Sequence, residues 1–80
     1  MRLLAPEQIR EGRDALALSE EQLGERLGVA QETIARWETG GVIQPRAMDN
    51  LLRVYFAFPE VRKALRGPDQ ATELGVTISG

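Results

Sequence analysis

The sequence predicts an all-α fold, a compact bundle of four to five short helices. The chain has 80 residues, enough for one small domain around a single modest core. Apolar residues recur at spacings of three and four, the pattern of one helix face. Prolines, glycines and a serine cap divide this pattern into short helical segments.

The first helix is expected to run from Pro6 to about Ala17. Proline suits the first helical position, because the N–H group that it lacks would have no partner there. Leu4 precedes it as a hydrophobic staple.

The second and third helices are expected at 20–27 and 31–39. Ser19 and Gln22 form a capping-box pattern at the start of the second helix. Gly28 accepts a positive φ at no steric cost and therefore ends that helix. The third helix is expected to end at the glycine pair 40–41.

The fourth helix has the strongest amphipathic pattern, and we expect it to begin at Pro45 and to end before Pro59. Its apolar residues are Met48, Leu51, Leu52, Tyr55 and Phe56. Pro59 then starts a short fifth helix that extends to Gly67. Together, residues 1–66 form the predicted domain, and residues 67–80 form a flexible tail. The alternative for "GVTIS" in this tail is pairing as an added strand.

Composition argues against several classes of function. The chain contains no histidine and no cysteine, so the usual zinc ligands and the commonest general base are absent. We expect no metal, no cofactor and no enzymatic activity. The longest apolar run, Val54–Phe58, is too short to cross a membrane, and we expect a cytoplasmic protein. The net charge of -2 means that any DNA binding depends on a local basic face.

Two short helices joined by a glycine-containing turn form a helix-turn-helix arrangement. The segment "IREGRDALALSEEQLGERLGVAQETIARWETG", continued by "QPRAMDNLLRVY", resembles the Cro/repressor-type, or xenobiotic-response-element, helix-turn-helix family. The resemblance covers residues 9 to about 65 and implies a lambda-repressor-like fold that binds double-stranded DNA. More weakly, "LLRVYFAFPEVRKAL" resembles the DNA-binding part of MqsA-like and HigA-like antitoxins.

Most of the framework shared with the family is expected to be core. Arg13 and Glu38 match an internal ion pair of the family, so the resemblance implies a structural role for both. Gly24 replaces the usual alanine, and we expect it to let the third helix cross the second closely. The expected core residues are Leu16, Leu18, Leu23, Leu27, Val29, Ile34, Trp37, Leu51 and Leu52.

Four residues on the outer face of the third helix match the positions that the family uses to read bases in the major groove. Arg36 can bind guanine through two hydrogen bonds, and Gln31 can pair with adenine. Glu32 can accept a hydrogen bond from cytosine, and Ala35 can contact a thymine methyl group. The alternative for each is an ordinary solvated helix face.

Phosphate contacts are expected at the helix ends and the following loop, from Ser19, Thr33, Thr39 and Arg46. Arg46 is equally compatible with a plain surface role. Two departures weaken the DNA hypothesis. Glu20 stands where the family commonly has glutamine, and Ala30 is a poor helix cap that costs about 1 kcal/mol.

Members of this family usually bind as two-fold dimers to half-sites about 34 Å apart. The expected dimer surface consists of Val42, Ile43, Tyr55 and Phe58, whereas Phe56 is expected to lie under the fifth helix. The leading hypothesis is a homodimeric, sequence-specific transcriptional regulator, which reads a palindromic operator. The weaker resemblance extends this hypothesis to the antitoxin or autorepressor of a toxin–antitoxin operon. The alternative is a protein-interaction module of the same fold that binds a basic partner such as a toxin.

Overall fold

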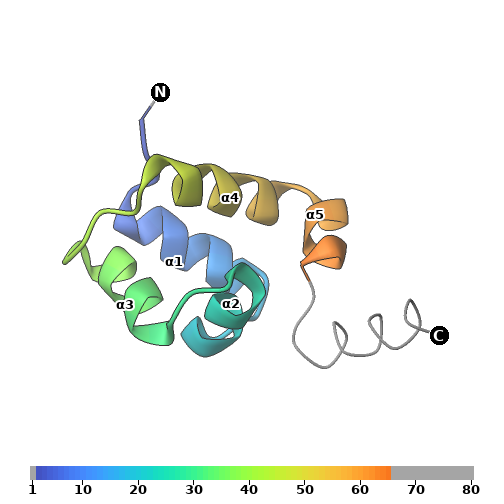
Figure 1. Cartoon of the computed structure of the whole chain (residues 1–80), viewed down its shortest axis with the longest axis horizontal. Coiled ribbons are helices and arrows are strands. Elements are labelled where there is room, and N and C mark those ends of the chain that lie inside the picture. The colour runs from blue at the N-terminus through green and yellow to red at the C-terminus, as the bar shows by residue number, and fades with distance from the viewer. Residues whose placement is uncertain (1, 66–80) are drawn as a thin grey trace.

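The computed structural model describes residues 2–65, which form five helices around one core (Figure 1). The helices are α1 (Pro6–Ala15), α2 (Glu20–Leu27), α3 (Gln31–Thr39), α4 (Arg46–Ala57) and α5 (Pro59–Ala64). No strand occurs within residues 2–65. The predicted all-α class is therefore confirmed, while the predicted tail at 67–80 lies outside the described residues.

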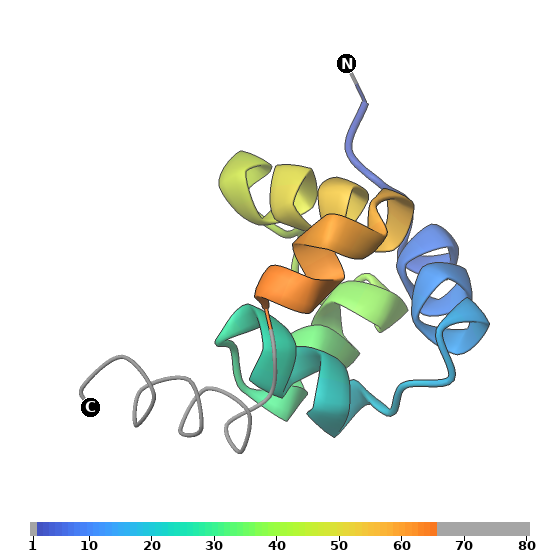
Figure 2. The ribbon, with the colours of Figure 1, turned by 90° about the vertical axis from the view of Figure 1, so that its right-hand side faces the viewer.

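The helices are arranged so that α1 lies between α4 and α3 (Figure 1). The closest helix pair is α2 and α3, and α3 also packs against α1. At the other end of the molecule α5 follows α4 and folds back against it, as the view in Figure 2 shows. This arrangement leaves one side of α3 and one side of α4 without a neighbouring helix.

The core receives residues from each of α1 to α4. Its buried apolar members are Ile9, Leu23, Ile34, Trp37, Leu52 and Tyr55. Around them pack the half-buried residues Leu16, Leu18, Leu27 and Val29, among others. Leu51, which was expected in the core, is only half-buried and lies outside this cluster. Most of the predicted framework is therefore core.

Helix α1 ends two residues earlier than predicted, at Ala15 instead of Ala17. Ala17 adopts a left-handed conformation with a φ of 58°, which reverses the chain. The Leu18 amide then donates to the Arg13 carbonyl at 3.2 Å, and the Ala17 amide donates to the Asp14 carbonyl at 2.9 Å. These two bonds form a Schellman-type helix end, in which alanine stands where glycine is usual.

The turn between α2 and α3 follows from two glycines. Gly28 has a φ of 78° and ends α2, as predicted. A methyl group at Gly24 would lie 2.5 Å from the Val29 carbonyl oxygen. The next neighbours are the Ala30 carbonyl carbon and the backbone nitrogen of Gln31, the first residue of α3, both at 3.6 Å. These contacts agree with the expectation that a small residue at 24 lets α3 approach α2 closely. Only glycine lets this turn fold back so tightly on α2.

The bounds of the last two helices also differ slightly from those predicted. Pro45 is the cap residue before α4, which begins at Arg46, and α5 ends at Ala64 instead of Gly67. The Arg62 guanidinium donates to the carbonyl oxygens of Tyr55 at 2.8 Å and Phe56 at 3.1 Å. These bonds use carbonyls that the end of α4 leaves open, and they fix the corner between the two helices.

Phe56 packs against α1, where Gly12 makes room for its ring. A methyl group at Gly12 would lie 2.6 Å from the Phe56 ring. Phe56 was expected to lie under the fifth helix. The contact with Gly12 shows that its ring also packs against α1. The small residue on α1 thus brings α1 and α4 close together.

A buried polar cluster at the start of α4 had no counterpart in the sequence analysis. The side chain of Asp49 is fully buried, and that of Gln44 is nearly so. Asp49 accepts hydrogen bonds from the Leu4 amide at 2.7 Å, Gln44 Nε2 at 2.9 Å and Arg53 Nε at 2.8 Å. Gln44 Nε2 also donates to the Leu4 carbonyl at 3.0 Å. The cluster therefore ties the N-terminal arm to α4.

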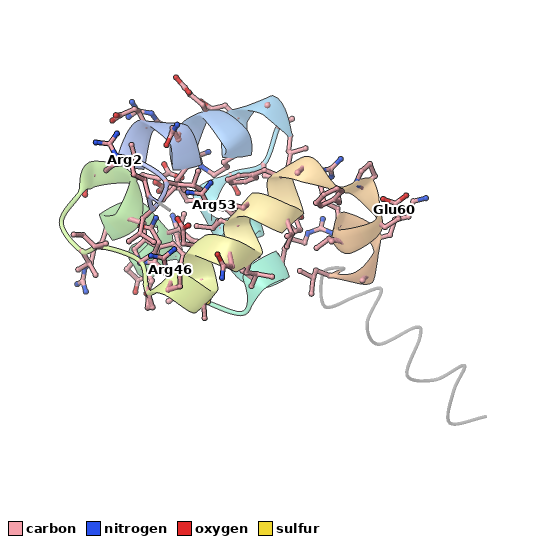
Figure 3. All side chains as sticks on the ribbon, turned by 90° about the horizontal axis from the view of Figure 1, so that it is seen from above. Arg2, Arg46, Arg53 and Glu60 are labelled. Atoms are coloured by element: carbon pink, nitrogen blue, oxygen red, sulfur yellow. The ribbon has the colours of Figure 1, made fainter. Side chains whose placement is uncertain are left out.

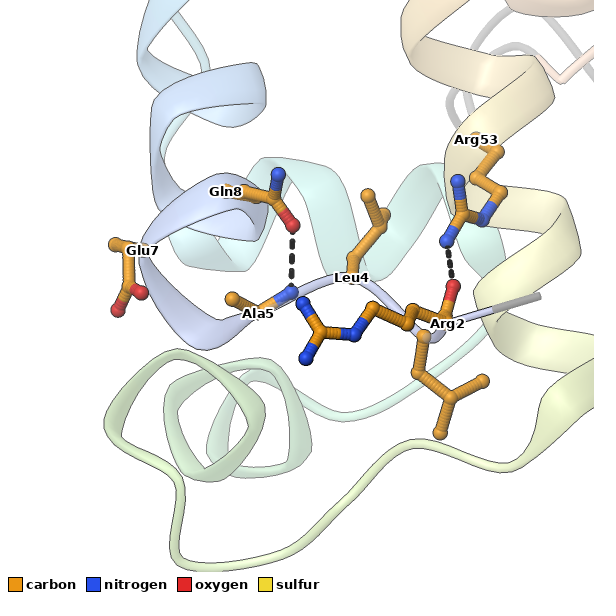
Figure 4. A pocket seen from close by; sticks show the side chains of 7 residues that line it. Arg2, Leu4, Ala5, Glu7, Gln8 and Arg53 are labelled. Carbon is orange, nitrogen blue, oxygen red and sulfur yellow. Dashed lines mark hydrogen bonds between the residues drawn. The ribbon is translucent and has the colours of Figure 1, made fainter.

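Ionisation of Asp49 reflects this environment. Burial disfavours its charged form, but the hydrogen bonds from Arg53, Leu4 and Gln44 outweigh burial and lower the pKa of Asp49 below its ordinary value. Arg53 also donates to the Arg2 carbonyl oxygen (Figure 4). A carboxylate that would be costly to bury alone is thus fully paired.

A second ion pair links α1 to α3. Arg13 Nε donates to Glu38 Oε2 at 2.6 Å, and Arg13 Nη2 donates to Glu38 Oε1 at 2.9 Å. The remaining Nη1 group donates to the Leu18 carbonyl at 2.9 Å. The Glu38 side chain is 4% exposed, and its hydrogen bond raises the pKa of Arg13 above the usual value. One guanidinium therefore joins α1, the turn after it and α3.

We predict that Glu38→Gln lowers the free energy of unfolding by about 3–5 kcal/mol, because Arg13 keeps a buried charge without its counter-ion. Urea unfolding followed by circular dichroism measures the change. Glu32→Gln, on the exposed face of the same helix, should change stability by less than about 0.5 kcal/mol. Equal effects of the two substitutions would contradict the structural role of the pair.

We predict that Asp49→Asn destabilises the fold by about 1–3 kcal/mol at pH 7, because an amide nitrogen then faces the donors of Arg53. The lowered pKa of Asp49 means that its charge stabilises the parent above the ordinary carboxyl pKa of 3.8, and that this contribution fades as the pH falls further. The difference between parent and variant should therefore shrink below pH 4. Urea unfolding of parent and variant at pH 7 and below pH 4 measures this difference, and an equal difference at both pH values would contradict the role of the Asp49 charge.

Candidate nucleic-acid interface

The outer side of α3 presents three polar side chains to solvent. Ile34 and Trp37 are buried in the core, which directs Gln31, Glu32 and Arg36 outward. All three are exposed. Helical periodicity therefore places an amide, a carboxylate and a guanidinium on one accessible surface, the set of groups that pairs with base edges.

Two of the predicted contact residues lie at the edge of this surface. Ala35 and Thr33 are half-buried, so they offer less area than their exposed neighbours. The methyl group of Ala35 suits a close apolar contact, and the hydroxyl group of Thr33 lies one turn after the Ala30 cap. Both are positioned to contact a partner only when α3 approaches it closely.

The two other predicted hydroxyl donors already take part in helix ends. Ser19 Oγ accepts from the Gln22 amide at 3.0 Å, and Gln22 Oε1 accepts from the Ser19 amide at 2.8 Å. This reciprocal pair is the predicted capping box. Thr39 donates its hydroxyl proton to the Arg36 carbonyl at 3.3 Å. Ser19 thus keeps its hydroxyl proton for an outside acceptor, whereas Thr39 would have to give up its helix-end bond.

Arg46 is exposed at the first turn of α4, just after the loop that follows α3. Figure 3 labels it on the same half of the molecule as Arg2 and Arg53, as seen from above. Arg53 is held by Asp49 and the arm, as described above. The basic groups near the start of α4 are therefore Arg46 and Arg2, both exposed.

Helix α3 begins without a side-chain cap. Ala30 supplies no hydrogen bond to the first turn of α3, as its side chain predicts. The backbone N–H groups of that turn point along the helix axis and carry its positive partial charge. Such a helix end favours an anion, and a phosphate group is one.

Glu20 faces into the structure. Burial raises the pKa of Glu20, hydrogen bonding with Glu38 raises it further, and the attraction of Arg13 opposes both effects. This carboxyl group therefore lies beside the ion pair between α1 and α3. The first residue of α2 therefore meets α3 through two carboxyl groups, an arrangement that disfavours the charged form of Glu20.

The predicted dimer surface is only partly accessible. Val42 is 46% exposed, Ile43 72% and Phe58 53%. Tyr55 is only 2% exposed, so its assignment to the dimer surface is wrong. The side chain is directed into the core beside Leu52, and its ring meets that of Phe56 edge to face with centroids 6.3 Å apart. Its position in the helical repeat belongs to the buried face.

Other kinds of site find less support within residues 2–65. No group of three or more acidic side chains there is placed to hold a metal ion, and no helix there is long and apolar enough to cross a membrane. An open groove of about 960 Å³ lies beside the N-terminal arm (Figure 4). It is lined by Arg2, Leu3, Leu4, Ala5, Glu7, Gln8 and Arg53. This groove includes none of the exposed residues of α3.

The comparison with known families decides the identity of this surface. The model of the helix-turn-helix family, of the Cro/repressor or xenobiotic-response-element type, matches residues 9–56 of the chain. The chain belongs to this helix-turn-helix family. The matched segment contains α1 to α3 and most of α4, so α2 and α3 are the two helices of its helix-turn-helix. No curated protein matches the chain.

Membership confirms the lambda-repressor-like fold and assigns the chain to a family of DNA-binding regulatory domains, not of enzymes. In a helix-turn-helix domain the second helix enters the major groove, and the first helix crosses the backbone. The exposed groups of α3 and the start of α2 are thus on the elements that meet DNA in this family.

We predict that Glu20→Gln raises the free energy of unfolding at pH 7 by less than about 1 kcal/mol, because it removes a charge beside Glu38. The raised pKa of Glu20 in the fold means that the parent gains stability on acidification, as this carboxyl group takes up a proton. The gain from the substitution should therefore vanish near pH 4. Urea unfolding at the two pH values tests this, with Glu21→Gln at an exposed position as the control. An equal gain at both pH values would contradict the placement of Glu20.

Proposed function

We propose that the protein is a sequence-specific transcriptional regulator that binds its operator as a homodimer. The observation that carries the proposal is the exposed group of Gln31, Glu32 and Arg36 on the recognition helix of a family member. The helix that carries these three side chains is firmly held, because its opposite side is fixed by Ile34, Trp37 and the ion pair at Glu38. Such a rigid helix suits direct base contacts in the major groove.

The proposed base contacts follow from the chemistry of each group. Arg36 binds guanine O6 and N7, Gln31 binds an adenine edge, and Glu32 accepts from a cytosine amino group. Ala35 contacts a thymine methyl group at the edge of the surface. Because Arg36 is the positively charged member, it also gains from the general attraction of the DNA backbone.

Phosphate contacts orient the helix in this proposal. We assign them to Ser19, Thr33 and Arg46, with Thr39 contributing only if it releases the Arg36 carbonyl. The uncapped start of α3 adds its backbone N–H groups. Few basic groups lie near the proposed DNA contact, and the carboxyl group of Glu20 is close to it. One subunit is therefore expected to bind weakly, so that binding depends on two half-sites.

A small operator-binding dimer can act as a repressor of its own operon. The resemblance of residues 51–65 to certain antitoxins extends the proposal to a toxin–antitoxin operon. Acting on chromosomal or plasmid DNA, such a regulator works in the cytoplasm. A second candidate function is a protein-interaction module that binds a basic partner such as a toxin. The exposed carboxylates of Glu21, Glu25 and Glu32 favour it, because they form an acidic surface along α2 and α3.

The test is a selection from random DNA duplexes at low salt, followed by titration of the enriched duplex. We predict a palindrome with half-site centres about one helical turn apart. Arg36→Ala should weaken binding about 10- to 100-fold and relax the preference for one guanine, because it removes a bidentate base contact.

Arg10→Ala is the matched control, since it removes the same charge from an exposed position on α1. It should change the affinity by less than about threefold, the effect of one distant charge. Equal losses in the two variants, or no enriched sequence, would contradict specific readout by α3. Retention of a protein partner by Arg36→Ala would then favour the second candidate function.

A further inference from the structure

The outer side of α4 is unusual for an exposed helix surface. Ala47, Asn50, Val54 and Ala57 are all exposed there, although Val54 is apolar and none of the four is charged. We call these four residues the α4 seam. The only carboxylate of α4 is Asp49, which is buried on the other side. A solvated helix face normally carries charged side chains, and this one does not.

The spacing of the α4 seam is that of a helix-pairing surface. Its members stand at intervals of three, four and three residues, which is the a and d pattern of a heptad repeat. Phe58 follows at its edge with 53% of its surface exposed, and the half-buried Leu51 lies on the same edge. The seam therefore continues into an apolar flank.

We propose that the α4 seam binds the α4 seam of a second copy of the chain, with the two helices antiparallel about a two-fold axis. This inference rests on the homodimer of the proposed function and names the surface that forms it. The partner is a second copy because the pattern is complementary to itself. In an antiparallel pair the residue numbers that face each other have a constant sum, so Ala47 faces Ala57 of the second copy and Asn50 faces its Val54.

Side-chain sizes fit this register. An alanine faces an alanine at both ends of the seam, which allows the two helix axes to approach to about 8 Å. The larger Asn50 and Val54 lie nearer the middle, on the two sides of the two-fold axis, which crosses each helix at the level of residue 52. A single asparagine at such a position favours one register over others.

Charge also favours a second copy. The chain has 12 acidic and 10 basic residues and a net charge of -2, so two copies repel each other weakly overall. The α4 seam carries no acidic residue and avoids that repulsion. On its basic flank Arg53 is compensated by Asp49 at 2.8 Å, which leaves Arg46 as the uncompensated charge of that flank.

Pairing through α4 leaves the recognition helix accessible. Helix α3 lies on the other side of α1 from α4 (Figure 1), so the seam and the exposed groups of α3 do not compete for one surface. Two copies joined in this way each keep Gln31, Glu32 and Arg36 free for DNA.

Cross-linking tests the register directly, because the chain contains no cysteine. We expect a mixture of the full-length variants Ala47→Cys and Ala57→Cys to form a covalent dimer with a short bis-maleimide. Neither variant alone should do so, since residue 47 of one helix lies about 15 Å along the axis from residue 47 of the other. Cross-linking of Ala47→Cys with itself, or no cross-link in the mixture, would overturn the proposal.

Sedimentation equilibrium without DNA provides a second, independent readout. Val54→Glu should raise the dimer dissociation constant at least about 100-fold, because it places a charge in the seam of each copy. Ala15→Glu, at an exposed position on α1, should leave it unchanged. If Val42→Glu separates the dimer and Val54→Glu does not, the loop after α3 is the interface and the proposal is wrong. Binding of DNA that depends on Arg36 while no cross-link forms would overturn the α4 pairing and leave the proposed function intact.

Discussion

The ion pair between Arg13 and Glu38 is the interaction on which the DNA-binding surface depends. It joins the last full turn of α1 to the end of α3, and the same guanidinium holds the Leu18 carbonyl in the turn that leads to α2. Three of the five helices are thus oriented by one side chain. Because a buried pair of this kind fixes geometry more than it adds stability, its main effect is to aim the exposed groups of α3.

The carboxyl group of Glu20, at the start of α2, is unfavourable both for the packing of α3 and for contact with DNA phosphate. The carboxyl group of Glu20 lies against Glu38, where glutamine is common in related domains and would brace α3 without a charge. The attraction of Arg13 offsets part of the repulsion between the two carboxyl groups. The remaining charge lies on the element that crosses the DNA backbone in this family, so it weakens binding without disturbing the direction of α3.

Much of this organisation could be predicted from local sequence signals. The capping box at Ser19, Gly28 and the apolar spacing of α3 and α4 each act within a few residues, and they gave the bounds of α2 and α3 correctly. Contacts between distant segments could not be predicted in the same way. Asp49 looks like a surface residue in the sequence, and only the approach of Leu4 and Gln44 explains its burial. Tyr55 was misplaced against a local signal, since its spacing of three residues from Leu52 already puts it on the buried face of α4.

The central claim is that α3 is the surface that meets DNA, and an amide-resolved NMR titration with a short duplex at low salt tests it most directly. The account predicts that the largest shift changes occur at Gln31, Glu32 and Arg36 and at the start of α2. Changes confined to the N-terminal arm and the start of α4, near Arg2 and Arg46, with α3 unaffected, would contradict it. In that case the basic groups of that region would be the DNA contact, and α3 would serve only the fold.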